Sequence, residues 1–341
     1  MKELLKRIYS DKITLCATIV LVVLYLAILF ADFLAVYPEN FSDRTLSYAP
    51  PSNIYVIDME GKLSRPYTYN YVKKFDSKTL NITFKEDKSR KHYINFFKGG
   101  KLISTDSDGR LFLLGTDING RDNYSRLLYG GQISLTIGFL ALFVSFPLGL
   151  MYGGISGYFG GKTDLIMMRL AEAIMSIPSF YLLIILASIL PSSMTSAQRF
   201  ALIVVILALI GWAGFARVVR GMVLSIKNED YVKSAKILGA SDFRIIWKHI
   251  LPQTSSYVIV AITLSVPSYI LAESGLSFLG LGIQQPDASW GNMLKEAQEF
   301  TNIISRPWLL APGGLIFIAV LSFNLLGDTI RDYLDPKGKL S

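Results

Sequence analysis

The chain has 341 residues, of which 51% are hydrophobic and 18% are charged, and its mean hydropathy is +0.41. This composition excludes an ordinary soluble domain and predicts an integral membrane protein. The net charge of +8 would suggest a nucleic-acid partner in a soluble protein. Here Lys and Arg collect at the ends of apolar runs, as the positive-inside rule requires, so we expect no nucleic acid to bind.

Metal and disulfide chemistry are excluded by the residue counts. The sequence has one cysteine, Cys16, inside an apolar run, and two widely separated histidines, His92 and His249. One thiol forms no intrachain disulfide, and two scattered imidazoles are too few for a metal centre. We therefore expect neither a metal site nor a cofactor.

The first apolar run covers residues 13–33 and follows a basic start that contains Lys2, Lys6, Arg7 and Lys12. Its length is roughly the 20 residues that a bilayer requires. A signal peptide is the alternative, but the run is too long for one and no small-residue cleavage site follows it. Residues 1–36 are therefore predicted to be a cytoplasmic N-terminus with a retained first span.

Residues 37–112 have a different composition, with prolines, glycine turns at Gly61 and Gly99–Gly100, and alternating apolar and polar residues at 79–84 and 92–97. A period of two predicts short antiparallel strands in an extracytoplasmic insert. This insert is either a docking surface for a soluble partner or a structural insertion, and the sequence leaves both roles open.

A polar segment, 113–132, precedes the second span and is expected to lie along the outer membrane surface; its residues 115–122 read Gly-Thr-Asp-Ile-Asn-Gly-Arg-Asp. In the second span, 133–159, small residues recur every fourth position at Gly149, Gly153 and Gly157. Such spacing lets two helix backbones approach closely, either inside one subunit or between subunits.

Four further spans are predicted at residues 165–190, 200–219, 255–274 and 310–330, which makes six. Both termini then lie in the cytoplasm, together with Lys162, the basic loop 217–249 and the tail 331–341, whereas the loop 191–198 has no basic residue. The distribution of basic residues therefore agrees with the predicted topology. The fold class is thus an all-α polytopic membrane protein with a core at 133–330 and a small β-rich insert.

The polar stretch 229–252 is predicted to form two short helices around Gly239, which supplies a left-handed residue at the end of the first helix. Ser241 or Asp242 caps the second helix. Tyr231, Ala235 and Leu238 recur at helical spacing in the first helix, and Phe243, Ile246 and Ile250 make an apolar stripe on the second. The basic side chains Lys233, Lys236, Arg244 and Lys248 are expected to face water or phosphate. The alternative is an amphipathic hairpin that lies on the membrane surface.

Residues 273–286 form a glycine-interrupted apolar piece that is too short to span a membrane, so non-helical backbone is expected there. Such backbone is tolerated at membrane depth when it is buried in protein or lines a cavity. A carboxylate at that depth is costly and marks a candidate functional site. We therefore weigh a translocation-pathway or gate role against a packing role for Glu273, Ser274, Ser277 and Phe278.

The stretch 229–252 resembles the EAA loop of ABC importer permeases, with matches at Ala235, Gly239, Leu251 and Pro252. It has Lys233 and Ser234 where that family has glutamate and alanine, and His249 where many members have isoleucine. Residues 115–122 and 273–291 resemble segments of dipeptide and oligopeptide permeases of the C-subunit type. The resemblance covers the first span and residues 113–336.

This resemblance implies type I ABC importer architecture in a bacterial inner membrane. It implies that a coupling loop, 220–252, seats on an ATPase through Lys233, Ser234, Ala235, Gly239, Ala240, Ser241, Asp242, Leu251 and Pro252. The implied partners are a second permease in a heterodimer, two cytoplasmic ATPase subunits and an extracytoplasmic solute-binding protein. The implied cargo is a peptide, with nickel or another small solute as alternatives inside the family.

Two other classes of function were weighed. A secondary transporter or channel needs ionisable residues near the membrane midplane or an internal repeat, and the sequence has few of the former and no convincing case of the latter. A membrane enzyme needs a catalytic motif, and none is recognisable around Ser, Asp or His. Because the chain has no Walker motif, we expect a non-catalytic subunit.

Overall fold

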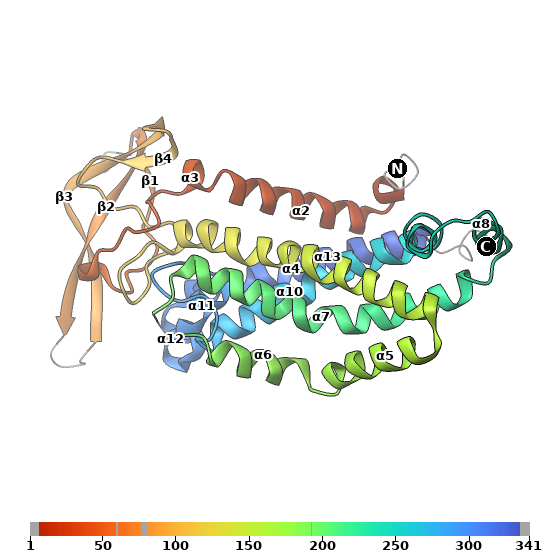
Figure 1. Ribbon diagram of the computed structural model, residues 1–341. Coiled ribbons are helices and arrows are strands. Elements are labelled where there is room, and N and C mark those ends of the chain that lie inside the picture. Colours follow the sequence, from red (N-terminus) through yellow and green to blue (C-terminus); the bar gives the residue numbers. More distant parts are fainter. Residues whose placement is uncertain (1–6, 59–60, 77–80, 192, 335–341) are drawn as a thin grey trace. The chain divides into compact units, whose positions relative to one another are not determined.

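The computed structural model describes residues 7–58, 61–76, 81–191 and 193–334 (Figure 1). The described chain is mainly helical and contains one small antiparallel sheet. It divides into two compact units. The first contains the described residues up to Val22, Leu135–Leu276 and those from Phe317 onward, and the second contains Val23–Ser134 and Ser277–Ile316.

The helices follow the apolar runs of the sequence. They are α2 (Lys12–Leu29), α3 (Ala31–Leu34), α4 (Asn123–Phe159), α5 (Gly161–Met175), α6 (Ser179–Ser188), α7 (Ser196–Ile226), α8 (Asp230–Ile237), α9 (Asp242–Ile245), α10 (Ser255–Phe278), α11 (Trp290–Leu294), α12 (Phe300–Ser305) and α13 (Ala311–Leu334). Among the described residues, five helical segments are long and apolar enough to cross a membrane. The number is six if α5 and α6, bent by 77° at residues 176–178, count as one span (Figure 1). The chain is therefore a multi-pass membrane protein.

Helices α4, α7 and α10 extend beyond the expected spans, and α7 (Ser196–Ile226) includes residues 220–226 of the expected loop 220–252. Helix α4 begins at Asn123 and includes the second half of the segment 113–132 that is expected to lie along the membrane surface. Helix α10 continues to Phe278, so the non-helical backbone expected from residue 273 onward is wrong for residues 273–278. The reason is local: Gly275 remains helical, whereas Gly280 adopts φ +79° and ends the helical run.

The first unit packs small residues against large ones. Buried Ala171, Ala213 and Ala216 surround Trp212, and Tyr152 packs against the same cluster. Three backbones from α4, α5 and α7 thus come together around one indole ring. The rings of Tyr152 and Trp212 have centroids 4.6 Å apart. This ring contact packs α4 against α7, and Ala171 brings α5 against the same part of α7.

The sheet belongs to the second unit and has the order β1 (Tyr55–Ile57), β2 (Leu63–Asp76), β3 (Asn81–Lys98), β4 (Lys101–Thr105), with every neighbouring pair antiparallel. The expected antiparallel strands are confirmed, and Gly61, Gly99 and Gly100 have positive φ between strands. Strand β3 is longer than expected because it crosses a run of charged residues, 85–91, with no apolar alternation. Backbone pairing with β2 holds residues 85–87 of that run in the sheet, and the register shifts across the rest of it, between Thr68 and Asn70 of β2.

The sheet is anchored on an aromatic core inside the second unit. Tyr37 stacks on Phe41 with ring centroids 4.0 Å apart, and the Leu111 amide donates to the Tyr37 hydroxyl at 2.8 Å. Phe112 is fully buried beside both rings. The segment after the last strand is therefore held against the segment that follows the first helix.

Candidate functional site

The stretch after α7 forms an elbow made of α8, Gly239 and α9. Gly239 has φ +80°, and its amide donates to the Lys236 carbonyl at 3.0 Å while the Ala240 amide donates to the Ala235 carbonyl at 3.1 Å. These two bonds are a Schellman motif. The Ser241 hydroxyl then accepts from the Arg244 amide and caps α9. The expected pair of short helices around a left-handed glycine is confirmed.

One face of the elbow is buried inside the first unit. Val232 and Ala235 from α8 are buried, and so are Ile245, Ile246 and Ile250 after the turn. A Cβ atom added to Gly154 of α4 would lie 3.2 Å from Ile246 and 3.3 Å from Leu251. The side chains of Ile246 and Leu251 therefore rest directly on the α4 backbone, which seats the base of the elbow.

The opposite face exposes apolar side chains. Ile237 and Leu238 are each 86% exposed and Phe243 is 68% exposed. Tyr231, Leu238 and Phe243 belong to the expected apolar sets of the two helices. All three are nevertheless exposed, because the neighbouring helices cover the side of Val232 and Ile245 instead. We call Ile237, Leu238 and Phe243 the apolar tip. A contiguous exposed apolar tip on an otherwise polar loop is typical of a protein interface.

Hydrogen bonds fix the elbow to the end of α4. The Lys227 ammonium donates to the carbonyls of Gly157 and Tyr158 at 2.8 and 3.3 Å. The Tyr158 hydroxyl donates to Asp242 Oδ1 at 2.6 Å. A cation that caps the carbonyl end of a helix is favourable. The elbow is thus tied to α4 on both sides of α8, through Lys227 at the end of α7 and through Asp242 of α9.

The three spaced glycines of α4 lie against α7. A Cβ atom at Gly149 would lie 2.6 Å from Phe215, one at Gly153 would overlap the Ala216 carbonyl, and one at Gly157 would lie 2.8 Å from the Arg220 carbonyl. No larger side chain fits at these positions without separation of the two helices. Inside this chain, the spacing brings α4 and α7 into backbone contact.

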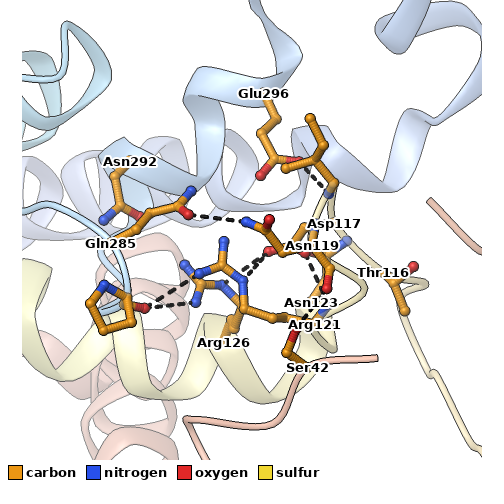
Figure 2. A network of polar contacts seen from close by, with 12 residues as sticks. Ser42, Thr116, Asp117, Asn119, Arg121, Asn123, Arg126, Gln285, Asn292 and Glu296 are labelled. Carbon is orange, nitrogen blue, oxygen red and sulfur yellow. Dashed lines mark hydrogen bonds and ion pairs between the residues drawn. The ribbon is translucent and has the colours of Figure 1, made fainter. Parts of the chain in front are cut away.

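The second unit contains a buried polar network that joins residues 117–126, at the start of α4, to residues 285–296, on both sides of α11 (Figure 2). Asp117 accepts from the Arg121 Nε at 2.6 Å and lies 3.6 Å from the Arg126 Nε. Both guanidinium groups also donate to the Pro286 carbonyl, at 3.5 Å from Arg121 and 3.1 Å from Arg126. Two cations, one carboxylate and one carbonyl therefore share one buried site.

Further contacts complete this network. The Asn119 amide group donates to Gln285 Oε1 at 3.1 Å, and the Ile118 backbone amide donates to Glu296 Oε2 at 3.0 Å (Figure 2). Gly120 has φ +70°, and a Cβ there would overlap the Asp43 carbonyl. Position 120 of the Gly-Thr-Asp-Ile-Asn-Gly-Arg-Asp segment therefore requires glycine, both for its backbone angle and for space.

Burial makes two carboxyls of this region hard to ionise. Burial raises the pKa of Glu296 to about 7, and the negative charge of Asp117 adds to the shift. Burial raises the pKa of Asp122 to about 6, although bonds from Ser125 oppose the shift. Among the described residues, Asp122 Oδ1 and Arg121 Nη2 are buried with no hydrogen-bond partner. Burial therefore destabilises the charged forms of these two carboxyls.

The proposed pathway residues are mostly buried. Glu273 and Ser277 have no exposed surface, and Ser274 is 6% exposed. The Ser274 hydroxyl donates to Glu273 Oε2 at 3.4 Å, and in the second unit the Ile283 amide donates to the Ser277 hydroxyl at 3.0 Å. Phe278 is the last residue of α10. In this conformation none of the three polar side chains faces an open channel.

A cavity of about 570 Å³ lies in the first unit between α6, α7 and α10. Its wall is largely apolar, with hydroxyls from Ser179, Ser265, Ser268 and Tyr269. The Tyr269 hydroxyl donates to Ser145 at 3.1 Å, and a Cβ at Gly211 would overlap that hydroxyl. Within the described chain, no three His, Cys, Asp or Glu residues are grouped to hold a metal ion.

Residues 145–339 match the family described as the inner membrane component of binding-protein-dependent transport systems. The chain belongs to this family. It is 45% identical over 225 residues to a dipeptide transport system permease protein of Bacillus subtilis, covering 65% of this chain and 68% of the relative. It is 42% identical over 226 residues to an oligopeptide transport system permease protein of Haemophilus influenzae, covering 66% and 70%.

The family match places the candidate residues in two groups. The elbow, the α4 glycines and residues 273–291 lie within the matched range of this permease, 145–339. The sheet and Asp117, Arg121 and Arg126 lie before it. A glutathione transport system permease protein of Pectobacterium atrosepticum is 39% identical over 226 residues, covering 66% of this chain and 73% of the relative.

Sequence reasoning identified the two ends of the buried network but missed that they meet. Both segments were singled out separately, at 115–122 and 273–291. The spacing of Asp117 and Arg121 is a usable signal for an ion pair, whereas nothing local links Arg126 to Pro286, 160 residues away. Sequence reasoning also missed the pair of Asp164 and Arg220.

Proposed function

We propose that this chain is the membrane-spanning permease subunit of an ATP-driven ABC importer for peptides that a binding protein delivers. Membership of the family and the peptide permeases among its relatives support this proposal. The observation that carries it furthest is the apolar tip, Ile237, Leu238 and Phe243, on an elbow that is otherwise rigidly anchored. An exposed apolar tip of this kind is typical of an interface with a protein partner.

The proposed topology has six spans, with α5 and α6 forming one bent span and both termini in the cytoplasm of a bacterial cell. The elbow then lies in the cytoplasm, and the sheet lies outside the inner membrane in an insert at residues 37–112. The core is 133–330 and the tail is 331–341. The distribution of Lys and Arg supports this orientation.

The elbow is the proposed site of coupling to an ATPase. Closure of two ATPase subunits on ATP displaces the apolar tip, and the bonds from Lys227 and Tyr158 transmit that displacement to α4 and α7. Among the proposed coupling residues, Lys233, Ser234, Gly239, Ser241, Asp242 and Pro252 are exposed and Ala240 is partly exposed, and these make the contact. Ala235 and Leu251 are buried and support the elbow from below.

Glu273, Ser274, Ser277 and Phe278 are proposed to form part of a closed gate. Burial of a carboxylate inside a membrane helix is costly, and a gate that opens to water relieves this cost. The 570 Å³ cavity next to α10 is the proposed section of the pathway, because its hydroxyls and apolar wall accommodate both the backbone and the side chains of a peptide.

The proposed assembly contains a second permease subunit, two ATPase subunits and an external binding protein, and this chain itself is not an enzyme. A stand-alone transporter or channel is the alternative. Reconstitution in liposomes distinguishes the ATP-driven assembly from a stand-alone transporter or channel. The complete assembly should accumulate labelled peptide in liposomes only with ATP, and the chain alone should accumulate none. Accumulation by the chain alone, without nucleotide, would overturn the proposal.

A matched pair of variants tests the apolar tip. Leu238→Glu places a charge where we propose that an ATPase docks, and it should abolish co-purification of the ATPase subunits. Val72→Glu makes the same change at another exposed apolar side chain, on β2, and should leave co-purification unchanged. Equal recovery of ATPase with both variants would argue against docking through the tip.

A further inference from the structure

A second cavity lies in the first unit beneath the elbow, at the ends of α4 and α7. Its volume is about 360 Å³. Its lining residues are Tyr158, Phe159, Lys227, Asn228, Val232, Lys233, Lys236 and Asp242. Three lysines and one carboxylate therefore face one space, and this cavity has a net excess of positive charge. The apolar tip lies elsewhere, since Ile237, Leu238 and Phe243 do not line it.

The charges of this cavity are only partly compensated inside the chain. Asp242 accepts a hydrogen bond from Tyr158, and Lys227 uses two of its three donors on helix carbonyls. Lys233 contacts Asp230 at 3.3 Å, but Asp230 is 100% exposed, and such surface pairs hold each other weakly. Lys236 has no ion-pair partner among the described residues. Lys233 and Lys236 therefore have donors available for an anion.

The position of this cavity indicates which class of anion it binds. It lies where α4 ends at Phe159 and α7 ends at Ile226, and both helices are candidate membrane spans. Phe159 is 53% exposed, and its neighbour in the lining, Tyr158, is of a residue type that is enriched at the level of lipid head groups. Basic pockets at that level, at the ends of membrane helices, suit anionic lipid head groups. The ring of Phe159 supplies an apolar surface for the first part of an acyl chain.

We propose that this cavity binds the phosphate group of an anionic phospholipid, with Lys233 and Lys236 as the main donors and Lys227 as the third cation. The lipid phosphate lies between the α4–α7 helix ends and α8, so it contacts both the membrane helices and the elbow. Asp242 lowers the affinity and keeps the site selective for an anion that several lysines contact at once. Zwitterionic lipids bind less tightly because their own positive group opposes the lysines.

The full chain in detergent, stripped of lipid, tests this site by direct binding. The probes are short-chain phosphatidylglycerol, the matching phosphatidylcholine and inorganic phosphate. The wild-type chain should bind phosphatidylglycerol more tightly than phosphatidylcholine. The double variant Lys233→Gln/Lys236→Gln should weaken phosphatidylglycerol binding about tenfold. Lys233→Arg/Lys236→Arg should retain the binding, which shows that charge at these positions, and not an altered fold, is responsible.

A control double variant removes the same amount of positive charge as Lys233→Gln/Lys236→Gln. Lys162→Gln/Lys248→Gln removes two exposed lysines that do not line this cavity and should weaken binding less than about twofold. Equal weakening by both double variants would overturn the site, and so would equal affinity for the two lipids. If inorganic phosphate binds as tightly as phosphatidylglycerol, the ligand is free phosphate and the lipid assignment is wrong. Binding is measured without ATPase or transport, so its outcome is independent of the proposed transport function.

Discussion

Arg220 of α7 and Asp164 of α5 form a two-point ion pair. The Arg220 Nε donates to Asp164 Oδ1 at 2.9 Å, and a second guanidinium nitrogen, Nη2, donates to Oδ2. The Ser156 hydroxyl of α4 donates to the same Oδ1 at 2.6 Å. Since a planar guanidinium matches a carboxylate in one orientation, this pair fixes the angle between α5 and α7. One carboxylate thus ties three helices together just before the elbow.

Replacement of Asp164 by Asn should destabilise the first unit. The side chain of Asp164 is 14% exposed and that of Arg220 is 33% exposed. Because this ion pair is intermediate between a surface pair and a buried one, we expect the free energy of unfolding to fall by about 2 kcal/mol. Thermal unfolding in detergent is the measurement. Lys162→Gln, at an exposed position two residues earlier in α5, should shift the midpoint little. Equal midpoints for Asp164→Asn and wild type would show that this pair is dispensable.

Gly239 is required for its backbone angle and not for space. No atom lies within 4 Å of an added Cβ, yet φ is +80°, which costs a side-chain-bearing residue about 1–2 kcal/mol. Gly239→Val should therefore distort the elbow and lower the number of peptides transported per ATP hydrolysed. Gly239→Asn should retain more coupling, because Asn tolerates this region.

The matched control for this glycine is Gly221 of α7, which also has open space around it but no positive φ. Gly221→Ala should leave coupling unchanged. If Gly239→Val couples as well as wild type, the left-handed residue is not needed for force transmission, and the proposed role of the elbow is wrong.

Alanine substitutions at two helical glycines should differ in their effect on the free energy of unfolding. A Cβ at Gly153 would overlap the Ala216 carbonyl and lie 2.9 Å from Val219, so Gly153→Ala should cost about 1–3 kcal/mol. The nearest atom to a Cβ at Gly214 is 3.8 Å away. Gly214→Ala should therefore be neutral or gain up to about 1 kcal/mol from helix propensity. Unfolding midpoints of the two variants, compared under one condition, check this difference; two equal midpoints would contradict it.

Glu296 should make the stability of the second unit fall as pH rises. Its pKa in the folded chain is raised to about 7 from the ordinary glutamate value of 4.5, so the folded state binds the proton more tightly than the unfolded state. This stabilisation is complete below the unfolded value and is lost as pH rises through the folded value. Between pH 6 and 8 we expect a loss of about 1 kcal/mol.

The measurement is the unfolding midpoint of the full chain at pH 6 and at pH 8. Glu296→Gln should remove most of the difference, since Asp122, with a pKa of about 6, titrates mainly below this window. Glu299→Gln removes the same charge at an exposed carboxyl nearby and should keep the wild-type difference. A pH slope that survives Glu296→Gln would place the titrating group elsewhere.

The elbow shows how far sequence reasoning reaches. The left-handed turn at Gly239 and the cap at Ser241 were predicted, because both depend on a few neighbouring residues. The predicted apolar stripe of the second helix is divided in the structure: Ile246 and Ile250 are buried, but Phe243 is exposed. Periodicity indicates that a helix has two faces, whereas the packing of Ile246 on Gly154 decides which face is covered.

The helix ends show the same limit. The apolar runs were found in the right order, but α10 continues past residue 274 to Phe278 because Gly275 remains helical. A glycine permits a helix to end and does not require it. Gly280, with positive φ, ends the helical run instead.

The sequence by itself determined that this chain lies in a membrane, where its apolar helices run, how Gly239 turns the elbow and which family it resembles. These properties depend on composition and on short windows of residues. Only the tertiary structure decided which distant charges meet, such as Asp164 with Arg220 and the two guanidinium groups with the Pro286 carbonyl. The physical reason is that such pairs form only after separate helices have packed, and the packing depends on shape across the whole unit.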